Sequence, residues 1–149
     1  MKPLRLTLLS IFAIVAILVF QNCNKTDPVK PIDATINILT SKAEWTVSSV
    51  NVPVNSATES SDWLNFKVSF TNTNMTTSGH PTGAQAVWPS GSYTVSEDGK
   101  SITRQDGVLM SLNPITETNF TSIFNIPEGT HLGGSRIAAL DGEYTFNMK

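Results

Sequence analysis

The chain has 149 residues, with ten Lys and Arg against twelve Asp and Glu, and a formal net charge of −2 at pH 7. A chain with this balance offers no basic patch to neutralise phosphates, which argues against nucleic-acid binding. Its single cysteine, Cys23, excludes a disulfide within the chain.

The first 23 residues have the layout of an export signal. Lys2 and Arg5 precede an apolar stretch from Leu6 to Phe20, and Cys23 follows shortly after it. The stretch is shorter than the roughly 20 residues of a membrane-spanning helix, and the order of its parts is typical of a signal peptide. A cysteine at this place resembles a lipoprotein signal, which predicts cleavage after residue 22 and acylation of Cys23, with palmitate among the chains. The alternative is an uncleaved N-terminal membrane anchor.

Removal of the first 22 residues leaves 127, a length that suits a single domain. Residues 23–41 are expected to comprise the acylated cysteine, a flexible tether containing Pro28 and Pro31, and a short helix. Asp33 is the expected N-cap of that helix, over residues 34–41. The folded domain is expected over residues 42–149.

Short runs of alternating residues separated by turns occupy the rest of the chain. The clearest is Leu64 to Phe70, which alternates apolar and polar residues. Asp106-Gly107 predicts a hairpin turn, and the apolar residues of 144–148 share one face of the last strand. A Thr- and Asn-rich stretch surrounds Met75. The other expected strands lie near 45–50, 93–95, 102–104, 108–112 and 120–126.

About eight strands at this spacing predict an all-β domain, either a closed antiparallel barrel or a β-sandwich. Strands with one apolar and one polar face suit an antiparallel sheet around a core. Closure into a barrel removes the exposed strand edges of an open sheet.

Few residues are available for catalysis or for metal binding. His80 and His131 lie among turn residues, and no His, Cys, Asp or Glu spacing indicates a zinc site. Asp98, Asp106 and Asp141 each precede a glycine, as turns require. No nucleophile elbow or phosphate-binding loop is present. We therefore expect a protein that is not an enzyme and that carries no cofactor or metal.

Arg136 follows a pair of glycines shortly before the last strand. One interpretation is an anchor for an anion at a barrel mouth. The favoured one is structural, with Arg136 paired to Asp141 or Glu143, or stacked on a tryptophan. Trp45 opens the first strand and is expected to plug one end of the core.

Five segments together resemble small lipocalin-like lipoproteins of the Bacteroidota, over roughly residues 42–149. They are Trp45-Thr46-Val47, Phe66 to Phe70, Val87 to Tyr93, Thr103 to Gly107 and Gly142 to Phe146. The resemblance implies an eight-stranded up-and-down barrel in which the first and last strands meet. Such a barrel holds one small ligand or is filled by side chains.

Two functions are weighed. The first is a lipid-anchored binding module of the cell envelope, held in the outer membrane by its acyl group, with the periplasmic or surface-exposed leaflet left open. It takes a small apolar or amphipathic ligand, or a partner protein. The expected ligand-binding residues are Trp45, Phe66, Phe70, Tyr93, Phe124, Arg136, Tyr144 and Phe146.

The same side chains would equally form a solid core, which leads to the second function. This is a structural or accessory subunit of an outer-membrane protein complex with a filled barrel. It predicts that Trp63 and Trp88 are exposed in one patch.

Overall fold

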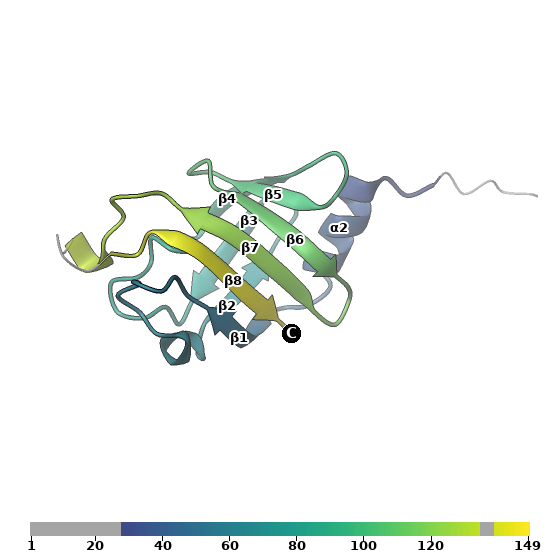
Figure 1. Cartoon of the computed structure of the whole chain (residues 1–149). Coiled ribbons are helices and arrows are strands. Elements are labelled where there is room, and N and C mark those ends of the chain that lie inside the picture. The colour runs from purple at the N-terminus through teal and green to yellow at the C-terminus, as the bar shows by residue number, and fades with distance from the viewer. Residues whose placement is uncertain (1–27, 135–138) are drawn as a thin grey trace, which may run out of the picture.

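The computed structural model describes residues 28–134 and 139–149, in which eight antiparallel strands form a closed barrel in chain order. Each strand pairs with the next, and β8 pairs with β1 to close the ring (Figure 1). The predicted lipocalin-like, up-and-down β-barrel is confirmed, and the β-sandwich alternative is wrong. The strands are β1 (Trp45–Asn51), β2 (Lys67–Phe70), β3 (Asn74–Ser78), β4 (Gly91–Val95), β5 (Ser101–Arg104), β6 (Leu109–Ile115), β7 (Phe120–Ile126) and β8 (Gly142–Met148).

The predicted short helix exists, but it begins three residues earlier than expected. Helix α2 (Pro31–Leu39) has Lys30 as its N-cap and Pro31 at its first position, so Asp33 lies in the first turn and is not the cap. Proline suits this position because its fixed φ is helical and its missing N–H has no helical partner there. No helix in the described ranges is long and apolar enough to cross a membrane.

The predicted strand at 64–70 is wrong in its first half. The short 3₁₀ helix η1 (Ser60–Trp63) ends against Leu64, which is 63% exposed, and β2 begins only at Lys67. The alternation of residues 64–66 therefore does not reflect a strand, because the turn around η1 interrupts it. The Thr- and Asn-rich stretch after β2 forms β3, whose Met75 is buried.

Strand β1 changes face part-way along its length. Its register against β8 shifts between Val47 and Ser49, which is the signature of a β-bulge. As a result Val50 is buried and Ser49 is exposed, whereas strict alternation from Trp45 predicts the reverse. In β8 the alternation is unbroken, and its apolar residues 144, 146 and 148 all face the core as predicted.

The barrel has two different ends. At the α2 end, the turns 71–73, 96–100 and 116–119 lie beside the helix; at the loop end lie the connections 52–66, 79–90, 105–108 and 127–141. In Figure 1, α2 is on the right of the barrel and the long connections are on the left. The loop end also carries η1 and a second 3₁₀ turn, η2 (Leu132–Gly134).

Helix α2 closes its end through a few specific contacts. Leu39 is fully buried, and its carbonyl accepts a hydrogen bond of 2.8 Å from Nε1 of Trp45. The hydroxyl of Thr35 donates to the carbonyl of Gly99 at 2.7 Å, which ties the helix to the β4–β5 turn. Trp45 packs edge-on against Phe120, with ring centroids 4.9 Å apart. The prediction that Trp45 plugs one end of the core is confirmed.

Candidate functional site

The predicted ligand-binding residues that the structure describes come together in the barrel interior, where none is more than 6% exposed. Their neighbours are mostly one another. Phe124 stacks on Tyr144 with centroids 6.0 Å apart, and Phe70 meets Tyr93 edge-on at 5.5 Å. These contacts leave the aromatic surfaces covered by other side chains. Ligand binding by these residues stays a prediction. Arg136 and Cys23 lie outside the described residues.

Two tryptophans from the long connections fill the half of the interior nearest the loop end. Trp63 and Trp88 both contact Phe146 edge-on, each with a centroid separation of 5.1 Å. Both indoles are fully buried, so the exposed tryptophan patch predicted for an accessory subunit is wrong. The large apolar side chains that are exposed among the described residues are Val29, Val54, Leu64 and Leu109.

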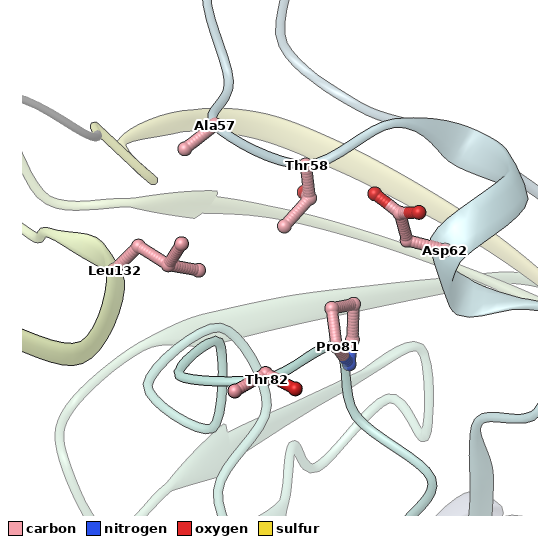
Figure 2. A pocket seen from close by; sticks show the side chains of 6 residues that line it. All are labelled: Ala57, Thr58, Asp62, Pro81, Thr82 and Leu132. Carbon is pink, nitrogen blue, oxygen red and sulfur yellow. The ribbon is translucent and has the colours of Figure 1, made fainter.

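A cavity of about 300 Å³ lies at the loop end, where three connections meet. The 52–66 connection contributes Ala57, Thr58 and Asp62; the 79–90 connection contributes Pro81 and Thr82; and the 127–141 connection contributes Leu132. Figure 2 shows the Leu132 side chain, the Pro81 ring and the Asp62 carboxylate converging on the same space. None of these residues was among the predicted site residues.

Backbone contacts hold the connections around the cavity. The N–H of Gly133 donates to the carbonyl of Gly83 at 3.0 Å, which joins the 127–141 and 79–90 connections. Gly79 has a φ of +70°, and a Cβ there would lie 1.9 Å from the carbonyl oxygen of Asn65, so only glycine permits this approach to the 52–66 connection. The cavity thus rests on direct contacts between loops far apart in sequence.

A chain of hydrogen bonds runs from the floor of the cavity into the barrel. The Tyr144 hydroxyl lies 2.9 Å from Oγ of Ser56, which lies 3.1 Å from Oγ1 of Thr58. Nε1 of Trp63 donates to the same Thr58 oxygen at 3.2 Å. Burial is the main cause that raises the pKa of Tyr144, so the phenol is neutral at pH 7. Because the Thr58 hydroxyl is engaged in this chain, its methyl group extends toward the cavity (Figure 2).

Among the described residues, Asp62 is the one ionisable side chain that lines the cavity. It belongs to η1, whose N-terminus has a capping box in which the N–H of Glu59 donates to Oδ2 of Asp62 at 2.8 Å. This bond fixes the carboxylate in its position at the rim. Thr82 adds a second polar group on the opposite side of the opening.

Arg104 has a structural role that was not predicted from the sequence. Its side chain is only 1% exposed and donates from Nη1 to the carbonyl of Val87 at 2.7 Å. Nε and Nη2 both reach the carboxylate of Asp106, and the guanidinium lies 5.5 Å from the Phe124 ring centroid. The hydrogen bonds from Arg104 hold the pKa of Asp106 below its usual range. The signal was present in the sequence, since Arg104 shares the inward face of its strand with Ile102.

The two histidines are part of the loop-end framework. Nε2 of His80 lies 2.7 Å from the carbonyl of Trp88, so this nitrogen carries the proton, and the ring packs edge-on against Phe66. His131 forms an isolated β-bridge with Ala139, and its Nδ1 is buried without a hydrogen-bond partner among the described residues. No group of three or more His, Cys, Asp or Glu in the described part of the chain is arranged to hold a metal ion.

Comparisons with known proteins assign no family to this chain. No protein-family model matches it, and no curated protein matches it at a significant level. The features of this chain that bear on function are therefore the geometry of the barrel and the pattern of the N-terminal sequence.

Proposed function

We propose that the protein is a lipid-anchored binding module of the cell envelope that takes a small amphipathic ligand at the loop end of its barrel. The observation that carries the proposal is the cavity of about 300 Å³ at the meeting point of three connections. Ligand sites in small barrels are commonly found at the mouth, and this volume is at the lower limit of ordinary ligand pockets. The role is one of binding without catalysis.

The N-terminal pattern supports the anchor. The positive head, the apolar stretch and Cys23 have the order of a lipoprotein signal, and acylation gives the single cysteine a role. Stable anchoring requires two membrane signals, such as the multiple acyl chains of a lipoprotein. The outer membrane is the proposed site, in either the periplasmic or the surface-exposed leaflet.

The position of α2 supports an orientation for the anchored protein. The tether enters the fold at Lys30, at the α2 end, whereas the cavity lies at the opposite end of the barrel (Figure 1). With Cys23 in the membrane, the seven residues from 24 to 30 reach at most about 25 Å. The α2 end then faces the lipid surface and the cavity opens away from it.

The second candidate function is a filled-barrel accessory subunit of an outer-membrane complex. The packing of Trp63, Trp88 and Phe146 supports the filled barrel of this candidate, because these side chains occupy the space where a lipocalin-type ligand would lie, although their burial removes the exposed patch expected for a partner. In this case the partner would contact the outer surface of the barrel, and the loop-end cavity would have no ligand.

Native mass spectrometry of the full chain, purified from membranes in detergent, distinguishes the two functions. The binding module predicts a small-molecule adduct that is lost on unfolding. Ala57→Phe places a ring in the cavity from an exposed position and should remove the adduct. Ala43→Phe, an equal change at an exposed position near the α2 end, should retain it. An adduct-free mass for the wild type contradicts the binding module and favours the accessory subunit.

A separate experiment tests the anchor. Cys23→Ala should move the protein from the membrane fraction to the soluble fraction and remove the mass of the acyl chains. A Cys23→Ala variant that stays in the membrane with an unprocessed N-terminus would instead support the uncleaved anchor.

A further inference from the structure

We propose that the loop-end cavity selects a compact organic cation, with an ammonium group beside Asp62 and a short apolar body against Leu132 and Pro81. This inference rests on the proposed binding function and names the chemical class of its ligand. In this proposal the ligand binds in the loop-end cavity and not among the aromatic residues of the barrel interior.

The size of the cavity limits the ligand. A volume of about 300 Å³ corresponds to that of about ten water molecules in the liquid, at about 30 Å³ each. A molecule of about ten non-hydrogen atoms fills this volume. The cavity therefore suits a small molecule with one charged end and one short apolar part.

The lining supplies an apolar wall with one charge. Ala57, Pro81 and Leu132 are apolar, and the methyl group of Thr58 adds to the same wall. Of the lining residues that the structure describes, Asp62 alone is ionisable, and an ionised carboxylate only accepts hydrogen bonds. Its Oδ2 takes the N–H of Glu59, while its Oδ1 has no hydrogen-bond partner among the described residues. Asp62 is exposed, so a donor on the ligand, positively charged for preference, would replace water at this oxygen.

The charge around the opening points to the same class. The described residues of the four loop-end connections include five acidic side chains and no lysine or arginine, and four of the five remain when Asp106 is set aside as the partner of Arg104. Arg104, which reaches this end from β5, is buried and paired with Asp106. A negative field attracts cations and repels anions, so it raises the local concentration of an amine at the opening.

The basic side chains that the structure describes are elsewhere or already paired. Lys30 and Lys42 flank α2, Lys100 is in the β4–β5 turn, and Lys149 follows β8 at the same end. Lys67 forms an ion pair with Glu44 at 2.8 Å. No lysine is present in any of the four loop-end connections to bind a carboxylate or phosphate. The described lysines thus lie outside the connections that surround the cavity.

Three probes that share a benzene ring on a two-carbon side chain test the charge preference. They are phenethylamine, which is a cation at pH 7, 2-phenylethanol, which is neutral, and phenylacetate, which is an anion. Each is titrated into the ¹⁵N-labelled full chain in detergent and followed by amide NMR. The expected order of affinity is amine, then alcohol, then carboxylate, with shifts at Ala57, Thr58 and Thr82.

Two matched variants locate the charge. Asp62→Asn removes the charge and keeps an oxygen for the N–H of Glu59, so η1 is retained. We expect it to weaken phenethylamine binding about fivefold, the size of one partly exposed ion pair, and to leave 2-phenylethanol unchanged. Asp33→Asn removes an equal charge from α2 at the opposite end and should change neither affinity.

The remaining outcomes decide against the inference in distinguishable ways. If all three probes bind equally and Ala57→Phe abolishes their binding, the cavity is a binding site but the cation preference is wrong, and the proposed function stands. If phenylacetate binds best, the ligand class is anionic. If no probe shifts the cavity residues, the inference fails, and the native mass of the wild type separately decides the proposed function.

Discussion

The two ends of this barrel are closed by different means. At the α2 end, the helix immediately before β1 covers the opening, and Leu39 and Trp45 seal it with an apolar contact and one hydrogen bond. At the loop end, three long connections meet through backbone contacts and a chain of hydroxyl groups, and they leave a cavity. A helix that lies directly on the barrel buries its contact residues, whereas the three polar connections at the other end leave a cavity between them.

The largest loss of stability is expected where the 79–90 and 52–66 connections approach most closely. Gly79→Ala should lower the free energy of unfolding by about 3–4 kcal/mol, because it adds a left-handed backbone cost to an overlap with the Asn65 carbonyl. Gly107→Ala is the control, since its φ is also positive but no atom lies within 4 Å of the new Cβ. It should cost about 1 kcal/mol. Equal losses in urea unfolding would show that the loop contact contributes nothing.

The seal at the α2 end should have a slightly smaller effect. Leu39→Ala removes a fully buried side chain and should cost about 3 kcal/mol. Val29→Ala changes a side chain that is 64% exposed just before the helix and should leave stability unchanged. If Leu39→Ala costs less than about 1 kcal/mol by urea unfolding, the helix does not belong to the core and the comparison of the two ends fails.

The loop end should also respond to acid through Asp106. Its pKa is lowered by Arg104, so the ionised carboxylate stabilises the fold. This contribution is complete above the unfolded pKa of about 3.9 and is lost as the pH falls through the lower folded value. Asp106→Asn should cost about 2 kcal/mol at pH 7, because it leaves a buried guanidinium without its counter-charge, and the difference from wild type should shrink below about pH 4.

The control for that profile is at the opposite end. The pKa of Asp98 is also lowered, mainly by the Ser96 hydroxyl, but this carboxylate is fully exposed in the β4–β5 turn. Asp98→Asn should change stability much less than Asp106→Asn at pH 7. A pH profile that is the same for both variants would contradict the role of the buried Arg104.

The smallest change in stability is expected for a substitution in the barrel interior, between the two ends. The Ser122 hydroxyl is fully buried and has no hydrogen-bond partner in the described structure, so Ser122→Ala should change stability by less than about 0.5 kcal/mol. Ser56→Ala breaks the contacts to Tyr144 and Thr58 and should cost about 1–2 kcal/mol. Equal losses in thermal unfolding would mean that Ser122 bonds to interior water, and that the loop end admits water.

Much of the barrel was predictable from local pattern. The Asp106-Gly107 turn and the inward residues of β8 are as predicted, because alternation and turn residues act over a few neighbouring positions. Strand β7 spans the predicted residues, but Ser122 is buried and Ile123 is only half-buried. The register of β1 and the start of β2 differ from the prediction. A bulge in β1 and a 3₁₀ turn before β2 interrupt the alternation, and neither has a distinct local signal in the sequence. The helix was predicted, but with Asp33 as its N-cap, whereas the structure begins it at Pro31.

The candidate site was not predictable in the same way. The aromatic residues proposed from sequence do meet, because a closed barrel directs alternate side chains inward. The cavity instead combines Thr58, Asp62, Pro81 and Leu132 from three separate connections, none of which alternates or contains a recognisable motif. Their meeting depends on where the long loops fold back.

Sequence pattern alone was enough to predict an all-β chain with a set of inward aromatic residues and few groups suited to catalysis, and its N-terminal segment has the layout of an export signal. These properties follow from composition and short-range periodicity, which are fixed before the chain folds. Three features emerged from the folded structure alone: Trp63 and Trp88 fill the interior, Arg104 is buried against Asp106, and a cavity lined by Asp62 opens opposite α2. Each of these depends on contacts between residues distant in sequence, and packing within a closed barrel selects them.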